Sequence, residues 1–362
     1  MVIDGLPGGG AEKVVLTLAK GLIERGHRVS LFSLRSVCEY AIPTDLDYRV
    51  IKDSCKKPWR KLTELSRRAA QLDKEILAAE KNDTAFDLVI SHLHKTDRIV
   101  RRCPHLDANK TWFCLHGVFS ASYLARRKGF SLWLKKTKIH HIYQNRNIVG
   151  VSQYVVDDLK RSFDIQPKRE QVIFNPFDFE AIEALSLEPC ALEGKDYLVH
   201  IGRFHQTKRH DRLLRAYAKS GLEAPLVLIG QGNHAATKAI KDLAIDLDIS
   251  KRVIFKGFIS NPYPYIRHAK LLIVSSDSEG FGNVLVEALI CHTPVVSTRC
   301  PGGPVSILTG ELSRGLADMS EDSLAETMRD IYLHPPVMTK PEIEAYSIEA
   351  ICSQYLDLID IN

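Results

Sequence analysis

The segment from Leu271 to Thr298 constrains the fold more than any other part of the sequence. It opens with a short apolar run, Leu271–Ser275, that ends in small polar residues. A helical pattern follows at Asn283–Ile290, and Pro294–Ser297 is apolar again. This order predicts a strand, a turn, a helix and a second strand, which is the repeating unit of α/β sheets.

The turn of this unit combines glycines with carboxylates. Gly280 and Gly282 allow the backbone to approach a ligand closely, and the N–H groups at the start of the following helix suit a phosphate. Glu279 and Glu287 would repel a diphosphate, so as hydrogen-bond acceptors they fit neutral sugar hydroxyls better. A phosphate site between two diol sites describes a sugar nucleotide. The alternative is a buried strand–helix–strand unit with two solvated glutamates.

Length and composition favour a protein of two packed domains without a spanning helix. A chain of 362 residues predicts two domains, and 45% hydrophobic content is ample for their cores. No run of about 18 apolar residues predicts a spanning helix. We also expect no signal peptide, because the chain enters a glycine turn at residue 8. Eight scattered cysteines without a C-x-x-C pair indicate reduced cytosolic thiols.

The net charge of +5 hides an asymmetry between the two halves. Residues 1–150 carry 27 Lys and Arg against 15 Asp and Glu, whereas residues 151–362 carry 22 against 29. A basic half indicates an anionic partner, such as nucleic acid, an anionic lipid or a phosphorylated acceptor. Within it, residues 121–143 mix basic and aromatic side chains, which suits a membrane interface, and Lys56–Lys61 is a second basic cluster. An amphipathic helix packed on a sheet explains 121–143 equally well, and no recognition motif supports nucleic acid.

Two further strand ends lead into turns that suit phosphates. Gly8–Glu12 follows a short strand at Met1–Asp4, but it is not the G-x-G-x-x-G pattern of nicotinamide-cofactor sites. The strand Tyr197–Ile201 runs into Arg203 and Lys208, whose side chains can converge on a diphosphate. Each of these cations alone is more often a solvated side chain.

Histidines and aspartates near other strand ends are open to both functional and structural interpretations. His116 follows the strand Thr111–Leu115, at the edge where open α/β sheets bind ligands, so we favour a functional role over a satisfied loop histidine. Asp45-Leu46-Asp47 and Asp246-Leu247-Asp248 could be metal-binding D-x-D triplets. A solvated connection for the first and the solvated end of a helix for the second explain them better. The adjacent His140-His141 pair is interpreted as structural.

These motifs resemble those of the retaining glycosyltransferases of family four, the large group 1 family. The segment Glu279–Glu287 resembles the family's E-x7-E motif, and Gly8–Glu12 resembles its GGAE-type turn. Gly202–Lys208 resembles its G-R-x-x-x-x-K segment, and Gly302–Pro304 resembles the G-G-P turn of many cell-surface polysaccharide transferases. The resemblance covers nearly the whole chain. It implies an α/β fold of the GT-B type, with two Rossmann-like doubly wound domains facing a cleft.

The resemblance implies four segments. An acceptor-binding domain is expected at 1–175, a linker at 176–196 and a nucleotide-sugar-binding domain at 197–340. The last segment, 341–362, is expected to be a helix that packs back on the first domain.

The resemblance also implies the site residues. The catalytic residues are expected to be Glu279, His116, Arg203 and Lys208. The donor-binding residues are expected to be Gly10, Arg203, Lys208, Gly257, Phe258, Phe281, Gly282, Asn283 and Glu287. In this assignment the Arg and Lys grip the pyrophosphate, Glu279 and His116 lie by the donor sugar, and Glu287 holds the ribose. Neither a metal nor a cofactor is implied.

The implied activity is transfer of a hexose or N-acetylhexosamine from a nucleotide diphosphate sugar, most simply a UDP-sugar, with retention of configuration. The acceptor is expected to be a hydroxyl of a lipid-linked or lipopolysaccharide saccharide. We expect a cytoplasmic bacterial enzyme that works peripherally at the inner membrane through its basic half, without nucleic acid. A GT-B sugar-nucleotide 2-epimerase and a non-catalytic nucleotide-binding module remain as alternatives.

Overall fold

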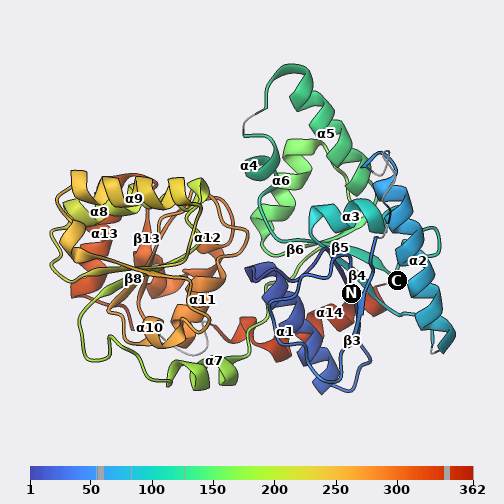
Figure 1. Cartoon of the computed structure of the whole chain (residues 1–362), viewed down its shortest axis with the longest axis horizontal. Helices are drawn as coiled ribbons and strands as arrows, with labels where there is room; N and C mark the ends of the chain where they lie inside the picture. Colours follow the sequence, from blue (N-terminus) through green and yellow to red (C-terminus); the bar gives the residue numbers. More distant parts are fainter. Residues whose placement is uncertain (54, 56–60, 83, 126, 338–342, 362) are drawn as a thin grey trace. The chain divides into compact units, whose positions relative to one another are not determined.

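The chain divides into two compact units, each with its own parallel sheet (Figure 1). The computed structural model describes residues 1–362 except 54, 56–60, 83, 126, 338–342 and 362. Unit 1 comprises Met1–Pro176 and Ile348–Asn362, and unit 2 comprises Phe177–Ser347. Most of the basic cluster predicted at Lys56–Lys61 falls outside the described residues. Among the helices that are described, none has the length and apolar character needed to cross a membrane.

Unit 1 is built on a seven-stranded sheet in the order β3-β2-β1-β4-β5-β6-β7, with every pairing parallel. Its strands are β1 (Val2–Ile3), β2 (Ser30–Ser33), β3 (Asp47–Val50), β4 (Val89–His92), β5 (Thr111–Leu115), β6 (Asn147–Gly150) and β7 (Arg169–Val172). Its helices are α1 (Gly10–Glu24), α2 (Glu64–Asn82), α3 (His94–Val100), α4 (Phe119–Tyr123), α5 (Gly129–Tyr143), α6 (Gln153–Phe163) and α14 (Ile348–Asp360). The central strands β4, β5 and β6 are buried along their whole length, as parallel strands covered by helices must be.

The last helix, α14, completes unit 1 by packing on the first. A Cβ atom added to Gly21 of α1 would lie 2.5 Å from Ile348 and 2.7 Å from Cys352, so the two helices can approach this closely only at a glycine. Tyr355 of α14 is buried, with its hydroxyl 3.5 Å from the Cys114 sulfur of β5. The C-terminal helix therefore belongs to the core of unit 1.

Unit 2 is built on a six-stranded sheet in the order β10-β9-β8-β11-β12-β13, again entirely parallel. Its strands are β8 (Leu198–Ile201), β9 (Leu226–Ile229), β10 (Val253–Gly257), β11 (Leu271–Val274), β12 (Val295–Thr298) and β13 (Leu316–Ala317). Its α-helices are α7 (Phe179–Ser186), α8 (His210–Ser220), α9 (His234–Asp246), α10 (Tyr263–Arg267), α11 (Asn283–Ile290), α12 (Pro304–Ile307) and α13 (Glu321–Leu333). Strand β11, turn, α11 and β12 follow the order predicted for the segment Leu271–Thr298.

The expected linker at 176–196 is instead an integral part of unit 2. It contains α7, whose start is capped by Asp178, the side chain of which accepts a hydrogen bond from the backbone N–H of Ala181. The helix packs on α10 and α11, and it buries Ile182 and Ser186. In the sequence this acidic segment shows little hydrophobic periodicity, so the helix was not recognised. Unit 2 therefore extends from 177 to 347 rather than from 197 to 340.

Each sheet has one point where the strand order reverses. In unit 1 this point lies between β1 and β4, and in unit 2 it lies between β8 and β11. Open α/β sheets bind ligands beyond the carboxyl ends of the strands at such points. The two loops most relevant to function in each unit are therefore those that leave these central strands.

Candidate functional site

An ion pair joins the two loops at the switch point of unit 2. Lys208 ends a short 3₁₀ turn after β8, and its Nζ donates to Oε1 of Glu279, beyond β11, over 2.6 Å. The same carboxylate oxygen accepts a hydrogen bond from the hydroxyl of Ser276. The Lys208 side chain is 26% exposed and that of Glu279 only 11%, so the pair is partly shielded from water. Two residues predicted from separate motifs are thus in direct contact.

Backbone contacts hold these two loops in register. The Ser275 hydroxyl donates to the carbonyl of Lys208 over 2.8 Å, and the N–H of Asp277 donates to the carbonyl of Thr207 over 2.8 Å. These bonds place the Lys208 stem beside the end of β11. The position of the cation therefore depends on the loop backbone as well as on its own rotamer.

The Gly302-Gly303 turn supports Glu279 from the other side. A Cβ atom at Gly302, whose φ is +122°, would lie 1.5 Å from the carbonyl oxygen of Glu279, and one at Gly303 would lie 1.9 Å from that of Phe281. The N–H of Glu279 donates to the carbonyl of Pro301 over 3.0 Å. The backbone of the G-G-P segment therefore packs directly against the loop that carries Glu279. Any side chain larger than hydrogen at these two glycines would clash with that loop.

Helix α11 begins directly after this turn. Gly282 precedes it with a φ of +101°, and Phe281 is buried against the rings of Phe177 and Tyr346. The first N–H groups of a helix and its dipole favour an anion at this end. One turn further on, the hydroxyl of Tyr263 donates to Glu287 Oε1 over 3.1 Å.

The remaining donor residues predicted in unit 2 lie at the same edge of the sheet. Arg203 follows β8 and is exposed, and its side chain has no hydrogen-bond or ion-pair partner among the described residues. Gly257 ends β10 with a φ of +72°, and its carbonyl accepts from the N–H of Gly230 over 2.7 Å. Phe258 comes next and is 63% exposed. Both a free cation and an exposed aromatic ring are thus available beyond the strand ends.

Sequence reasoning missed a charged network behind the ion pair. Arg212 of α8 is buried, and it donates to the carbonyl of Ser275 over 2.9 Å and to Asp277 over 2.7 Å. Arg209 also contacts Asp277, at 3.0 Å, and pairs with Asp211, which raises the pKa of the guanidinium. These side chains fix the loop that carries Glu279. Only the run of charges at 208–212 signals them in the sequence.

Two buried histidines lie beneath this loop and were also missed. Nδ1 of His200, in β8, donates to the carbonyl of Ile273 over 2.8 Å, because a carbonyl oxygen can only accept. The His200 ring packs edge-to-face against the ring of His210, with the ring centres 4.7 Å apart. Burial lowers the pKa of His200 to about 4 and that of His210 to about 2. Both rings are therefore neutral at physiological pH.

The glycine turn of unit 1 is surrounded by carboxylates. A Cβ atom at Gly9 would lie 2.2 Å from a Glu12 oxygen, and one at Gly8 would lie 2.6 Å from a Glu39 oxygen. Gly10, predicted to bind donor, is the first residue of α1. Acidic side chains at this helix start suit hydroxyl groups better than phosphate.

His116 lies beyond β5, beside a second histidine. Its Nε2 is 3.0 Å from Nδ1 of His92, the last residue of β4. Burial lowers the pKa of His92 well below its usual value and that of His116 to about 4. With Cys114, these residues place three potential metal-ligating atoms within 4.8 Å of one another. Two histidine nitrogens at 3.0 Å form a hydrogen bond, which requires no metal.

A hydrogen-bonded chain lies next to this pair in unit 1. Buried Asp97 accepts from the hydroxyls of Ser91 and Tyr143, each over 2.6 Å. The hydroxyl of Tyr143 is in turn 3.0 Å from Nδ1 of His94, at the start of α3. Burial raises the pKa of Asp97 to about 8 and lowers that of His94 to about 3.

The D-x-D triplets have structural surroundings. Asp47 lies in β3, where it accepts from the Ser30 hydroxyl over 2.7 Å and pairs with Arg49 at 2.8 Å. Asp246 ends α9, and Asp248 follows with a φ of +54°. Asp47 is thus ion-paired at the start of a strand, and Asp246 and Asp248 lie at the end of a helix.

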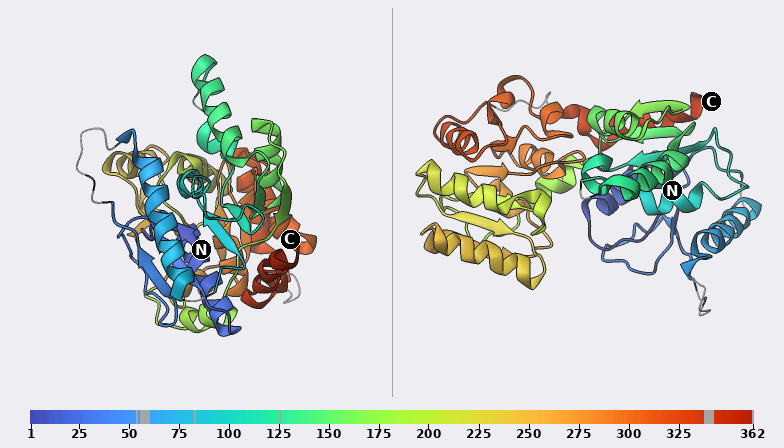
Figure 2. Two further views of the ribbon diagram at one scale, coloured as in Figure 1. Left: turned by 90° about the vertical axis from the view of Figure 1, so that its right-hand side faces the viewer. Right: turned by 90° about the horizontal axis from the view of Figure 1, so that it is seen from above.

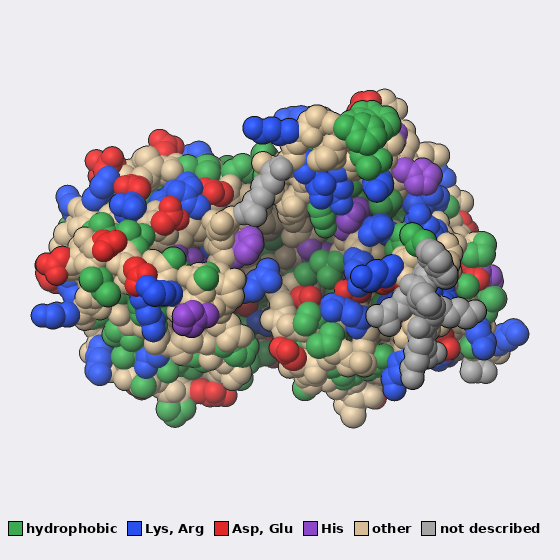
Figure 3. Space-filling model, turned by 45° about the horizontal axis from the view of Figure 1, so that its top comes forward, with side chains coloured by type: hydrophobic (Ala, Val, Ile, Leu, Met, Phe, Trp, Pro, Cys, Tyr) green, Lys and Arg blue, Asp and Glu red, His purple; other side chains and the backbone are tan. Residues whose placement is uncertain are grey.

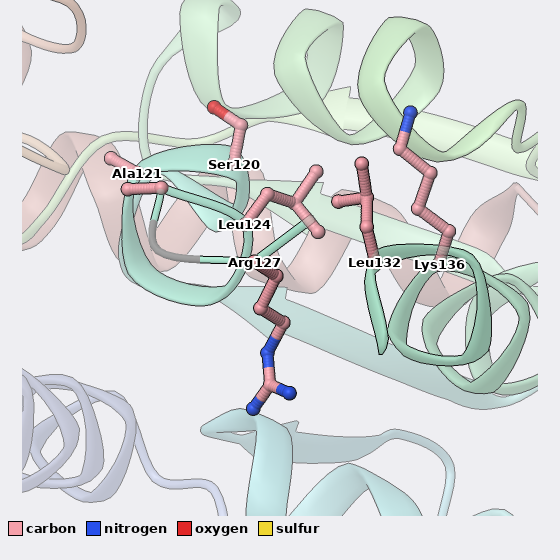
Figure 4. A pocket seen from close by; sticks show the side chains of 7 residues that line it. Ser120, Ala121, Leu124, Arg127, Leu132 and Lys136 are labelled. Atoms are coloured by element: carbon pink, nitrogen blue, oxygen red, sulfur yellow. The ribbon is translucent and has the colours of Figure 1, made fainter. Parts of the chain in front are cut away.

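The basic and aromatic stretch forms α4 and α5, and α5 projects from unit 1 (Figures 1 and 2). Phe130 and Trp133 are 74% and 58% exposed and stack at 5.5 Å. Figure 3 shows an apolar patch at the top of unit 1 with lysine and arginine side chains below it. A hollow of about 430 Å³ lies between α4 and α5. In Figure 4 Leu124 and Leu132 face each other across it, whereas Arg127 points away.

Two family models match successive parts of the chain. One, described as Glycosyltransferase Family 4, matches residues 8–181. The other, described as Glycosyl transferases group 1, matches residues 188–347. The two matches meet close to the boundary between the units.

Curated relatives include bacterial transferases. The chain is 28% identical over 313 residues to the N-acetylgalactosamine-N,N'-diacetylbacillosaminyl-diphospho-undecaprenol 4-alpha-N-acetylgalactosaminyltransferase of Campylobacter jejuni, covering 83% of this chain and 80% of the relative. It is 29% identical over 170 residues to the lipopolysaccharide core biosynthesis glycosyltransferase LpsE of Rhizobium meliloti, covering 45% of this chain and 49% of the relative.

Solved structures share the fold at low identity. Sucrose-phosphate synthase of Thermosynechococcus elongatus superposes with a TM-score of 0.79 at 19% identity, over 99% of this chain and 95% of that one. HepE of Anabaena, solved in complex with UDP and glucose, gives 0.71 at 18% identity, over 100% and 96%.

Proposed function

We propose that this chain, which belongs to the group 1 glycosyltransferases of family four and has their GT-B fold, moves a sugar from a nucleotide diphosphate donor to a saccharide hydroxyl. The observation that carries the proposal is the Lys208–Glu279 pair at the switch point of unit 2. The pair supports the proposal because it brings a cation, which suits a phosphate, next to a carboxylate, which suits sugar hydroxyls.

Unit 2 supplies the groups that a nucleotide diphosphate sugar needs. Lys208, Arg203 and the start of α11 bind the pyrophosphate, on which negative charge develops as the sugar leaves. Glu279 accepts hydrogen bonds from donor-sugar hydroxyls. Glu287, already oriented by Tyr263, accepts them from the ribose. A UDP-linked hexose or N-acetylhexosamine fits this assignment.

The transfer step needs no covalent enzyme intermediate. The acceptor oxygen bonds to the anomeric carbon, the bond from that carbon to the phosphate oxygen breaks, and the acceptor proton passes to the leaving phosphate. Configuration is retained because attack and departure occur on the same face. Two cations and a helix start stabilise the diphosphate, so we propose that no metal ion is required.

The acceptor is proposed to be a lipid-linked or lipopolysaccharide saccharide reached at the cytoplasmic face of the inner membrane. The Campylobacter relative acts, by its name, on a diphospho-undecaprenol. In this chain, α5 offers the exposed rings of Phe130 and Trp133 together with Lys136 and Lys138. Apolar and basic side chains on one projecting helix fit the interface of an anionic membrane.

Incubation with a panel of nucleotide sugars, with and without a prenyl-diphosphate disaccharide, tests the function. We expect sugar transfer only when both substrates are present, and a product whose anomeric proton coupling shows the donor's configuration. Conversion of the donor alone would indicate an epimerase, and nucleotide binding without turnover would indicate a binding module. Glu279→Gln is the inactive control.

Co-sedimentation with anionic liposomes tests the membrane contact. Each lysine near such a surface contributes about 1 kcal/mol, so Lys128→Gln/Lys136→Gln/Lys138→Gln should release most of the protein at low salt. The matched control is Lys238→Gln/Lys241→Gln/Lys251→Gln in unit 2. Equal binding of the two triple variants would reject α5 as the contact.

A further inference from the structure

We propose that His94 contacts the saccharide acceptor, accepting a hydrogen bond from one of its hydroxyls at Nε2, and that Tyr143 and Asp97 are positioning residues that hold the ring for this task. The proposal rests on the proposed function. It assigns a role to a histidine that no motif singled out, at the carboxyl end of β4 in unit 1.

The hydrogen-bonded chain fixes which nitrogen of His94 carries the proton. Once Asp97 is ionised its carboxylate can only accept, so the Tyr143 hydroxyl donates to it and the Tyr143 oxygen is left to accept from Nδ1–H of His94. A neutral imidazole has one N–H and one bare nitrogen, so Nε2 is then a hydrogen-bond acceptor. Such chains are cooperative, because each bond polarises the next.

The inner end of the chain is anchored and the outer end is open. Asp97 and Tyr143 are fully buried, and Ser91 gives the carboxyl its second hydrogen bond. His94 itself is half-buried. Its Nε2 has no hydrogen-bond partner among the described residues and is not one of their buried polar atoms, so a ligand can reach it. An anchored ring with one accessible acceptor atom is a preorganised contact for a hydroxyl donor.

The surroundings of His94 favour a saccharide with anionic groups nearby. The ring packs against those of Phe119 at 5.6 Å and Tyr123 at 4.9 Å. Lys135 lies 4.2 Å from the centre of the Tyr123 ring, and its charge, with that of Arg98, helps burial to keep His94 neutral. A neutral acceptor atom beside cations suits a sugar hydroxyl attached to a phosphate-bearing lipid.

The tautomer is tested by nitrogen-15 NMR of the histidine rings. Spectra are recorded at about pH 9, above the pKa of about 8 that burial gives Asp97, so that the carboxyl is ionised. We expect the Nδ1–H form of His94 in the unaltered protein and a mixture of forms in Tyr143→Phe, where the chain is broken. An Nε2–H form in the unaltered protein would overturn the proposal, as would an unchanged signal in Tyr143→Phe.

The ligand contact is tested by titration and kinetics. A short-chain prenyl-diphosphate disaccharide should shift the His94 ring signals even without donor, which keeps this test independent of transfer. His94→Phe should raise the KM for this acceptor about tenfold, as expected for one lost hydrogen bond, with UDP affinity unchanged. His94→Gln should recover most of the loss, and His141→Gln, at an exposed position of α5, is the matched control.

The absence of any shift at His94 overturns the contact, whether or not the probe binds elsewhere. Equal acceptor KM in His94→Phe and the control does the same. Failure of the proposed function is distinguishable, since it would appear as no transfer despite a shifted His94 signal.

Discussion

The switch-point edges of the two sheets have the same topology and different electrostatics. In unit 2 the strand ends carry ionised groups in contact, with Lys208 on Glu279 and Arg212 on Asp277. In unit 1 Asp4, beyond β1, pairs with Arg35 and Lys95. The buried groups near the ends of β4 and β5, however, are neutral, because burial lowers the pKa of His92 and His116 and raises that of Asp97. Unit 2 holds its charged groups as ion pairs, whereas unit 1 keeps the buried groups near the ends of β4 and β5 uncharged.

The difference matches the chemistry proposed for each edge. A diphosphate needs a cation that is already in place, and Glu279 keeps Lys208 ordered until the diphosphate arrives. The saccharide hydroxyls proposed to bind at unit 1 can also be met by an uncharged acceptor such as Nε2 of His94, which does not attract counter-ions into the site. Four predictions, from the largest expected effect to the smallest, test this contrast.

Arg212→Met should destabilise unit 2 by about 3 kcal/mol, because it leaves the Ser275 carbonyl and Asp277 without their buried partner. Urea unfolding followed by circular dichroism measures this. All three tryptophans belong to the sequence of unit 1, so their fluorescence is an internal control. Arg215→Met, on an exposed face of the same helix, should change stability by less than about 0.5 kcal/mol. Equal effects of the two variants would show that the network contributes nothing.

Lys208→Met should weaken UDP by about 1.5–3 kcal/mol, the contribution of a charge-assisted hydrogen bond, and Arg203→Met should act in the same direction. Glu279→Gln should leave UDP affinity intact or slightly stronger, since it releases Lys208 from its ion pair, while turnover falls. Calorimetric titration with UDP separates the variants. Unchanged UDP affinity in Lys208→Met and Arg203→Met would reject the pyrophosphate assignment.

Asp97→Asn should remove a pH dependence of stability between pH 6.5 and 8. In this window the unfolded carboxyl has lost its proton while the folded one, with its pKa raised to about 8, retains it, so stability falls as pH rises, by at most about 1.4 kcal/mol per pH unit. The buried histidines act in the opposite direction, but only below about pH 6.5, where their unfolded forms take up protons. Chemical unfolding at several pH values measures the slope. If the free energy of unfolding depends on pH with the same slope in Asp97→Asn and in the unaltered protein, the carboxyl of Asp97 is not protonated in the folded state.

Tyr263→Phe should weaken UDP about fivefold, since it removes the hydrogen bond that orients Glu287 without removing the carboxylate. Glu287→Ala should have a larger effect, because the ribose contact itself is lost. Tyr265→Phe, on the same short helix, is the control. If Tyr263→Phe matches that control, Glu287 is positioned by other contacts.

The sequence predicted what lies within single motifs. The family resemblance and the fold of two parallel sheets were confirmed. Both were predictable because strand–turn–helix units produce local patterns of apolar runs and glycines in the sequence. The site assignments remain predictions, although the structure brings Lys208 and Glu279, 71 residues apart, into contact.

The missed features depend on long-range packing. Tyr143 and Asp97 are 46 residues apart, and Arg212 and Asp277 are 65 apart, with no periodic pattern that links either pair. The short helix α7 was also missed, since an acidic segment with two buried positions resembles a linker. Polar networks of this kind are set by tertiary contacts rather than by local propensity.

The docking of α14 on α1 has a consequence for biosynthesis. Every residue of unit 2 precedes α14 in the chain, so a nascent polypeptide can finish unit 2 while the groove beside Gly21 still lacks Ile348 and Cys352. Domains generally fold as units during synthesis. The first half to leave the ribosome is therefore the last to be completed, and until then its exposed apolar surface is a natural target for chaperones.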